Sequence, residues 1–351
     1  MRFYVGGYSP KISVCELDVA DGSMRVVADA QTPKNGSWLS VSPDLRTLYA
    51  TVESGYDSGS PGTVAAYRIA SDATLSAIGT AESCAPGPCH LAVDATRRIL
   101  TVANYGGETF GVVRLDDSGT PGEVIGCGRH TGSSVHPKRQ REPHPHATVF
   151  SPDYRYLYVC DLGTDEVVHY SADALAGGVI ERAGAVAAPA GSGPRHIVFT
   201  PDGRWAYLVN ELSNTVIAYS VDTESGALSQ VDEQPMLPPE WSGESTAAEI
   251  WLHPSGRFVY ASNRGHDSIV IFSRRDDGTM SVKGHVSSGG QSPRHFSLDS
   301  AGVWCLVANQ QSDNVVSYRV DHDSGVLAAT GHILSLTQPS CAVFAAVDPA
   351  S

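Results

Sequence analysis

Short apolar stretches separated by Gly, Pro, Asp and Asn recur along the whole chain. In each unit an apolar stretch leads into a turn of the Pro-Asp-Gly type, and a second stretch follows in which apolar and polar residues alternate. A loop and a third stretch complete the unit. Alternation with a period of two is typical of β-strands, and such turns join antiparallel neighbours. The pattern predicts repeated antiparallel sheets, with the clearest copies at residues 197–222, 250–275 and 296–321.

Three weaker copies precede these, at residues 39–53, 91–116 and 148–173. The intervals are 52, 57, 49, 53 and 46 residues, measured between the turn positions Pro43, Ala95, Pro152, Pro201, Pro254 and Ser300. A period near 50 residues is typical of a β-propeller, in which each copy forms one blade. We assign a fourth strand to the variable stretch before each next copy. Long helical periods and a G-x-G-x-x-G turn that opens a helix are missing from the sequence, which disfavours a TIM barrel or a Rossmann fold.

The two ends of the chain complement each other. Residues 2–22 match the second and third strands of the other copies, and residues 341–348 supply one further strand. Pairing the two ends makes a seventh blade and removes the exposed sheet edges of an open array. We therefore predict an all-β fold, a seven-bladed β-propeller of four-stranded antiparallel blades, closed by the N- and C-terminal strands. A single domain should span residues 1–351.

Composition and charge restrict the partners. The chain has 24 Lys and Arg against 38 Asp and Glu, a formal net charge of -14, so we expect no broad binding to nucleic acid. No apolar run is long enough for a membrane span, and the first residues lack the apolar stretch of a signal peptide. We predict no membrane contact, a cytoplasmic location, and a monomer or weak homo-oligomer.

Seven cysteines are scattered along the chain without a C-x-x-C pair, and Cys84 and Cys89 are the closest two. An odd number with this spacing favours buried, reduced thiols over disulfides or a zinc site. We therefore expect neither a bound metal nor another cofactor.

Equivalent positions of a propeller repeat converge on its central channel. Six residues before each turn the copies carry Ser37, Cys89, His146, Arg195, Ala248 and Arg294. The next position carries Trp38, His90, Ala147, His196, Glu249 and His295. Seven of these twelve residues are His, Arg or Glu, which predicts a polar pocket; the alternative is a buried polar network that satisfies itself.

We call the residues at one equivalent position of the six copies a column. The loop after the second strand gives two more such columns. Nine residues past the turn stand Val52, Asn104, Asp161, Asn210, Asn263 and Asn309, which we interpret as structural, because Asn tolerates turn geometry and bonds its own backbone. The following column reads Glu53, Tyr105, Leu162, Glu211, Arg264 and Gln310. Glu211 and Arg264 should point into neighbouring space, as site residues or as a simple ion pair. Glu53 is a weaker candidate because its copy is the least regular.

Ten stretches between Pro88 and Tyr318 resemble one known family. They are PCHLAVD, VANYGG, RQREPHPHATVFSPD, DLGTDEVVHY, GPRHIVFTPDGR, VNELSNTV, TAAEIWLHPSGR, ASNRGHDSI, PRHFSLD and VANQQSDNVVSY. The chain resembles the seven-bladed propeller lactonases, the group with bacterial propeller-type 6-phosphogluconolactonase and fungal carboxymuconate cyclase. The proposed site of the cyclase, a His, two Arg and a Glu, implies catalytic roles here for His146, Arg195, Glu211 and Arg264. Substrate-binding candidates are His144, His196, His90, Arg294 and His295.

Opening a lactone with water needs a base, positive donors at the developing oxyanion and a proton for the leaving alkoxide. His146 or Glu211 can serve as the base, and two arginines can hold an anionic substituent and the oxyanion. The predicted function is hydrolysis of a small anionic lactone, with 6-phosphogluconolactone as the expected substrate. The same residue types also suit a cyclase that closes an unsaturated carboxylate onto its double bond.

Two further alternatives concern other parts of the chain. A propeller can serve as a non-catalytic binding scaffold, although the tryptophans, Trp241 apart, lie mostly in or beside predicted strands rather than on a rim. Residues 128–146 form the only basic, His-rich segment, which could carry Lys138, Arg139 and Arg141 over the pocket as a lid or form a solvated loop between blades.

Overall fold

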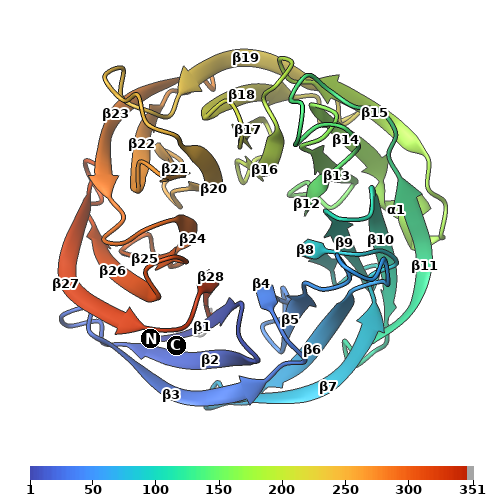
Figure 1. Ribbon diagram of the computed structural model, residues 1–351, viewed down its shortest axis with the longest axis horizontal. Coiled ribbons are helices and arrows are strands. Elements are labelled where there is room, and N and C mark those ends of the chain that lie inside the picture. The colour runs from blue at the N-terminus through green and yellow to red at the C-terminus, as the bar shows by residue number, and fades with distance from the viewer. Residues whose placement is uncertain (346–351) are drawn as a thin grey trace.

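In the computed structural model, which describes residues 1–345, seven sheets of four antiparallel strands form a ring. One strand of each sheet faces the central channel (Figure 1). These innermost strands are β4 (Gly36–Val41), β8 (Pro88–Asp94), β12 (Pro145–Phe150), β16 (Pro194–Phe199), β20 (Thr246–Leu252), β24 (Pro293–Leu298) and β28 (Pro339–Phe344). The predicted all-β propeller fold is confirmed.

The other strands of each blade follow outward from the channel. The second strands are β5 (Thr47–Val52), β9 (Ile99–Asn104), β13 (Tyr156–Asp161), β17 (Trp205–Asn210), β21 (Phe258–Arg264), β25 (Trp304–Asn309) and β1 (Arg2–Gly7). The third strands are β6 (Thr63–Ile69), β10 (Thr109–Leu115), β14 (Glu166–Ser171), β18 (Thr215–Val221), β22 (Ser268–Arg274), β26 (Asn314–Val320) and β2 (Lys11–Leu17). The outermost strands are β7 (Leu75–Glu82), β11 (Pro121–Arg129), β15 (Arg182–Ala187), β19 (Leu228–Pro235), β23 (Met280–Ser287), β27 (Leu327–Ser335) and β3 (Met24–Gln31). The one helix of the described residues is α1 (Ala172–Ala176), which is not long and apolar enough to cross a membrane.

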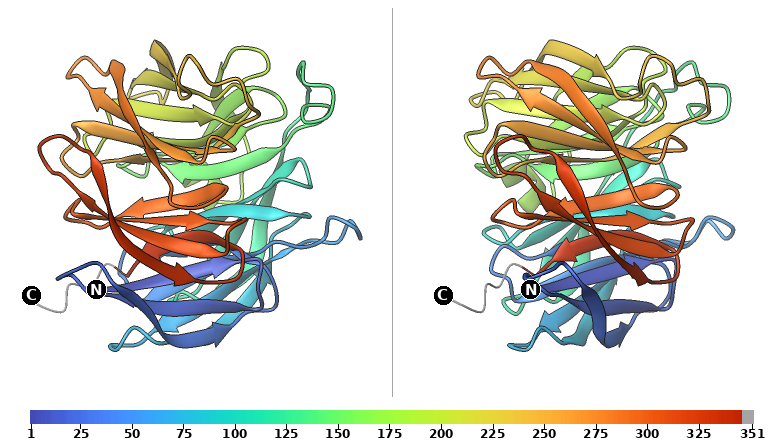
Figure 2. Two further views of the ribbon diagram at one scale, coloured as in Figure 1. Left: turned by 60° about the vertical axis from the view of Figure 1, so that its left-hand side comes forward. Right: turned by 90° about the vertical axis from the view of Figure 1, so that its left-hand side faces the viewer.

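The two ends of the chain close the ring as predicted. Strand β28 pairs antiparallel with β1, with Val5 opposite Ala342, and β2 and β3 complete that sheet. In Figure 2 the blue N-terminal strands and the red C-terminal strands lie side by side. The closing strand begins at Pro339, two residues before its predicted start; residues 346–348 of that prediction, and the end of the predicted domain, lie outside the described residues.

Apolar side chains fill the interfaces between neighbouring blades. One such cluster joins Tyr207, Val209, Val259 and Ala261, all fully buried, from strands β17 and β21. A second-strand tyrosine also donates to a backbone carbonyl in the hairpin before the outermost strand of the next blade. The pairs are Tyr4 to Ala73, Tyr49 to Gly119, Tyr158 to Gly226, Tyr207 to Gly278 and Tyr260 to Gly325, at 2.6 to 3.0 Å. These bonds join neighbouring blades at five of the seven interfaces of the ring.

The asparagine column is structural, although its partners differ from the prediction. Asn104 donates through Nδ2 to the carbonyl of Ser83 (2.8 Å), Asn263 to Met236 (3.0 Å) and Asn309 to Ser288 (2.9 Å). Each carbonyl lies in the connection that enters the blade, rather than in the asparagine's own turn.

Two cysteines contradict the prediction of reduced thiols throughout. Cys84, in the connection between β7 and β8, forms a disulfide with Cys127 on β11, with their Cα atoms 6.3 Å apart. The other five cysteines are buried and free. The pair is 43 residues apart in sequence, and only the blade brings the connection back against its own outermost strand. Spacing alone therefore gave no sign of it.

Candidate active site

The channel holds two cavities, one toward each end. The first residues of the innermost strands and the loops after the second strands line a polar pocket of 340 Å³. We use the term polar pocket for this cavity, which is lined by Glu53, Tyr56, Cys89, Tyr105, Arg139, His146, Glu211, Arg264 and Arg294. Later residues of the same strands line a larger, mainly apolar cavity of 660 Å³. Because the innermost strands run along the channel, the two cavities open toward opposite faces of the ring.

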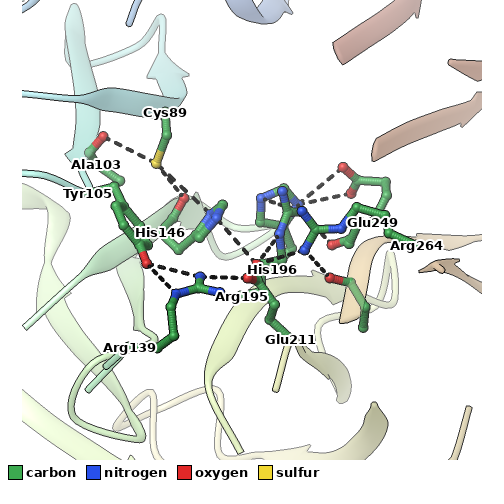
Figure 3. Close-up of polar contacts among 12 residues, drawn as sticks. Cys89, Ala103, Tyr105, Arg139, His146, Arg195, His196, Glu211, Glu249 and Arg264 are labelled. Carbon is green, nitrogen blue, oxygen red and sulfur yellow. Dashed lines mark hydrogen bonds and ion pairs between the residues drawn. The ribbon is translucent and has the colours of Figure 1, made fainter. Parts of the chain in front are cut away.

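Glu211, directly after β17, lies at the centre of one wall of the polar pocket (Figure 3). Its Oε1 accepts from Nη2 of Arg139 at 2.6 Å, and its Oε2 accepts from Nε of Arg195 and lies 3.0 Å from Nη2 of Arg264. Nε2 of His146 lies 3.8 Å from Oε2. The structure therefore brings together the four residues predicted as catalytic, with Arg139 as a fifth member.

Burial disfavours the charged form of Glu211, but Arg264, Arg195 and Arg139 outweigh it and hold the pKa of this carboxyl well below its usual range. Burial also lowers the pKa of Arg264 to about 10, partly offset by Glu211, so the guanidinium stays charged at neutral pH. Glu211 is thus a permanently ionised anchor for three cations.

The two predicted arginines are held at fixed angles by backbone carbonyls of β20. Arg264 donates through Nη2 to the carbonyl of Ala247 at 2.7 Å, and Arg195 donates through Nη1 to that of Ala248. Nε of Arg264 is buried and has no hydrogen-bond partner among the described residues.

His146, on β12, is 5% exposed and has the thiol of Cys89 beside it, 3.9 Å from Nδ1. Burial, with Arg195 as the next contribution, lowers the pKa of His146 well below its usual value. At neutral pH the imidazole is uncharged, so it can accept a proton or donate a hydrogen bond within the pocket.

The basic segment before β12 contributes one residue to the pocket. Arg139 donates to the hydroxyl of Tyr105 from Nε (3.1 Å) and Nη2 (3.0 Å) as well as to Glu211. Lys138 and Arg141 do not line the pocket. The segment therefore supplies an arginine to the wall, which is closer to the lid interpretation than to a solvated loop.

Residues 2–344 match the family model described as Lactonase, 7-bladed beta-propeller. The chain belongs to this lactonase family. It is 32% identical to a 6-phosphogluconolactonase of Formosa agariphila, over 92% of this chain and 94% of that protein, and 30% identical to one of Bacillus subtilis, over 97% and 96%. The solved structure of the Pseudomonas aeruginosa periplasmic gluconolactonase PpgL superposes with a TM-score of 0.92 at 32% identity, covering 98% of this chain and 99% of that one. The predicted family is confirmed, and these relatives support lactone hydrolysis by an enzyme.

The lactonase has a second wall that the sequence analysis mostly missed. Glu53, after β5, accepts from the hydroxyls of Tyr8 (2.9 Å) and Tyr56 (3.0 Å). Arg294 lies with its guanidinium carbon 5.7 Å from the ring centre of Tyr8. Tyr8 directly follows β1, so it is the closing blade's equivalent of Glu53 and Glu211, and extending that column to the seventh blade would have found it. Tyr56 stands in a loop that the other copies do not share, whereas Glu53 and Arg294 did occupy columns.

Four predicted substrate-binding histidines of the lactonase lie outside the polar pocket. His144 stacks on Tyr105, with 4.4 Å between the ring centres. Its Nδ1 donates to the backbone carbonyl of Tyr105 at 2.8 Å, and His144 does not line the polar pocket. His90, His196 and His295 line the apolar cavity instead, with their ring centres 4.1 to 5.1 Å from that of Trp38.

The reason is the position along the innermost strand. The column of His146, Arg195 and Arg294 lies at the start of its strands, beside the polar pocket, and the residues from the next column onward line the apolar cavity. His196 hydrogen-bonds Glu249 through Nδ1 at 3.1 Å, and His295 lies 3.7 Å from the same carboxylate. This second column forms the polar network that was the alternative in the sequence analysis, and it separates the two cavities.

Proposed function

We propose that this lactonase hydrolyses a small lactone that carries an anionic group, with 6-phosphogluconolactone as its substrate. The observation that carries the proposal is Arg294. It lines the polar pocket, and it makes no hydrogen bond or ion pair with any residue between 1 and 345. Its guanidinium is therefore available to an anion, unlike Arg139, Arg195 and Arg264, which already bind Glu211.

Charge supports the same substrate class. Four arginines face two carboxylates in and beside the pocket, so the site is positive within a chain of net charge -14. A guanidinium presents donors in a planar fork that matches phosphate or carboxylate. Burial disfavours the charge of Arg294, but Tyr8 and Glu53 outweigh it and raise the pKa of this side chain. Arg294 thus stays charged throughout the range in which the enzyme can be assayed.

The reaction follows from the positions of the charges. Arg294 and the free edge of Arg264 hold the anionic group and the carbonyl oxygen, where negative charge develops when water attacks the lactone carbon. Glu211 keeps Arg195 and Arg264 in place. The sequence analysis left His146 and Glu211 as alternative bases. Protonating Glu211 would leave three guanidiniums without their counter-ion, so its role is that of an anchor.

The decisive assay compares kcat/KM for 6-phosphogluconolactone, unphosphorylated gluconolactone and unsaturated dicarboxylates, over the spontaneous rates. A charge-assisted contact contributes about 1.5 to 3 kcal/mol, so the phosphorylated lactone should be preferred by roughly tenfold to a hundredfold. Equal activity on the neutral lactone would contradict the anionic substrate. Turnover of dicarboxylates alone would favour the cyclase, whose substrate would use the same arginines. EDTA should leave the rate unchanged, since arginines supply the positive charge.

A cytoplasmic role in carbohydrate metabolism is part of this proposal. The Cys84–Cys127 disulfide weakens the argument for a cytoplasmic location, because disulfides persist mainly in oxidising compartments. Fractionation of the producing cells, with the enzyme followed by antibody, tests the compartment directly.

A further inference from the structure

The polar pocket contains two buried carboxylates with opposite surroundings. Glu211 has three guanidinium partners within 3.0 Å. Glu53, 8% exposed, has none among the described residues; its two side-chain partners are the hydroxyls of Tyr8 and Tyr56. Both glutamates line the same 340 Å³ cavity, so substrate lies between them when it is bound.

The tyrosines fix the direction of the hydrogen bonds around Glu53. Burial raises the pKa of both hydroxyls far above neutrality, and the carboxylate of Glu53 adds to the increase. Each hydroxyl therefore stays protonated and donates, one to each carboxylate oxygen. A carboxylate oxygen accepts more than one hydrogen bond, so each retains capacity toward the cavity.

The backbone holds Glu53 in place. Its amide donates to the carbonyl of Asn35 at 3.0 Å, and Nδ2 of Asn35 donates back to its carbonyl at 3.2 Å. Around the carboxylate, the ionisable groups are the two tyrosines, Cys89 on β8 and Arg294 on β24. Only Arg294 is charged, and it makes no direct contact with Glu53 among the hydrogen bonds and ion pairs of residues 1–345. Glu53 is thus an acceptor of two hydroxyl hydrogen bonds that makes no direct ion pair among the described residues.

We propose that Glu53 is the general base of the lactonase, with Tyr8 and Tyr56 as its positioning residues. The inference rests on the proposed function. Glu53 takes a proton from water while the water oxygen bonds to the lactone carbon and the carbonyl electrons move onto oxygen. The tetrahedral intermediate collapses, the bond between that carbon and the ring oxygen breaks, and the proton on Glu53 passes to the departing alkoxide. The product is the open hydroxy acid, which loses its own proton to solvent.

The test is a kinetic comparison of Glu53→Gln with His146→Gln and Glu211→Gln. A general base contributes about 10² to 10⁴ in rate, so Glu53→Gln should lower kcat by that factor with KM changed less than about threefold. Glu166→Gln, on the outer strands where it pairs with Arg182, is the matched control and should keep full activity. Circular dichroism and thermal melting establish that each variant is folded.

A positioning role for the tyrosines gives a separate readout. Hydrogen bonds to a carboxylate favour its charged form, so Tyr8→Phe and Tyr56→Phe should move the acid limb of the kcat profile to higher pH. These variants keep the carboxylate, and they test the inference even if Glu53→Gln does not fold.

Three results would overturn the inference. One is a folded Glu53→Gln with kcat close to wild type; another is a rise in KM without loss of kcat, which would make Glu53 a hydroxyl-binding residue. The third is loss of kcat in His146→Gln alone. Failure of the proposed function gives a different result. In that case the wild-type enzyme itself would not hydrolyse 6-phosphogluconolactone faster than the spontaneous reaction.

Discussion

Arg195 and Glu211 form an ion pair of 3.0 Å in the interior of one blade, with 3% and 4% of their side chains exposed. Arg195 is the second residue of the innermost strand β16 and Glu211 follows the second strand β17, so the antiparallel pairing of these strands sets the contact. Removing one member of a buried pair leaves an uncompensated charge, at a cost of about 3 to 5 kcal/mol. We predict this loss for Arg195→Ala and Glu211→Ala in urea unfolding. A loss below about 1 kcal/mol, as is typical of a surface pair, would contradict it.

The same pair predicts how stability depends on pH. The arginines lower the pKa of Glu211 in the folded protein from an ordinary value of 4.5, so the ionised carboxylate stabilises the fold. This contribution is fully present above pH 4.5 and is lost as the pH falls toward the lowered value. The difference in unfolding free energy between wild type and Glu211→Gln should therefore shrink on acidification below 4.5. A difference that is constant or grows would show that Glu211 is not stabilised as an anion.

Substrate charge should separate Arg264, which the sequence analysis predicted as catalytic, from Arg294, which it predicted as substrate-binding. Arg294 has no protein partner for its donors among the described residues, whereas Arg264 also binds Glu211 and Ala247. Arg294→Ala should lower kcat/KM for the phosphorylated lactone by roughly tenfold to a hundredfold and leave the neutral lactone nearly unchanged. Arg264→Ala should lower kcat/KM for both lactones, because it removes one of the three arginines that bind Glu211. Arg182→Ala, on an outer strand, is the control. Equal losses of kcat/KM for both lactones in Arg294→Ala would show that Arg294 does not bind the anionic group of the substrate.

Much of this fold could be predicted from the sequence because its repeat is local. The turns at Pro201 and Pro254 and the alternation around them mark each blade without knowledge of distant contacts. Equivalent positions then converge by geometry, which is why the repeat columns already contain Glu211 and the three residues that meet around its carboxylate, His146, Arg195 and Arg264.

The remainder depends on features that the six aligned copies do not contain. Tyr8 follows the second strand of the closing blade, which the columns left out, and Tyr56 and Arg139 reach the pocket from loops that differ between blades. His90 and His196 line the apolar cavity rather than the polar pocket, because the columns do not show where along the channel one cavity ends and the other begins. Both errors concern side chains whose placement needs the three-dimensional ring.

Reduction of the disulfide should affect stability and not catalysis. Cys84 and Cys127 close a loop with a sequence separation of 43 residues, for which chain entropy predicts a stabilisation of about 4 kcal/mol, with measured values commonly between about 2 and 4. Neither residue lines the polar pocket. Cys84→Ser should therefore lower the unfolding free energy by about 2 to 4 kcal/mol with kcat unchanged at 25 °C. Cys15→Ser, at a buried free thiol, controls for loss of a sulfur atom. A Cys84→Ser variant as stable as wild type would mean that the disulfide does not constrain the unfolded chain.

The closing strand offers the most direct test of the ring. Removing the chain after Leu336 deletes β28, which leaves one edge of β1 unpaired in the channel and exposes Val5 and its neighbours, fully or nearly fully buried in the intact protein. An unpaired apolar edge invites aggregation, so the truncated chain should be poorly soluble and lack a cooperative melting transition. A synthetic peptide of residues 337–345 should restore both by adding the missing strand, since strand addition to an open edge supplies the backbone hydrogen bonds. A scrambled peptide of the same composition should not. A truncated chain that is soluble and melts like wild type without the peptide would show that the N-terminal strands and the other six blades close the ring without β28.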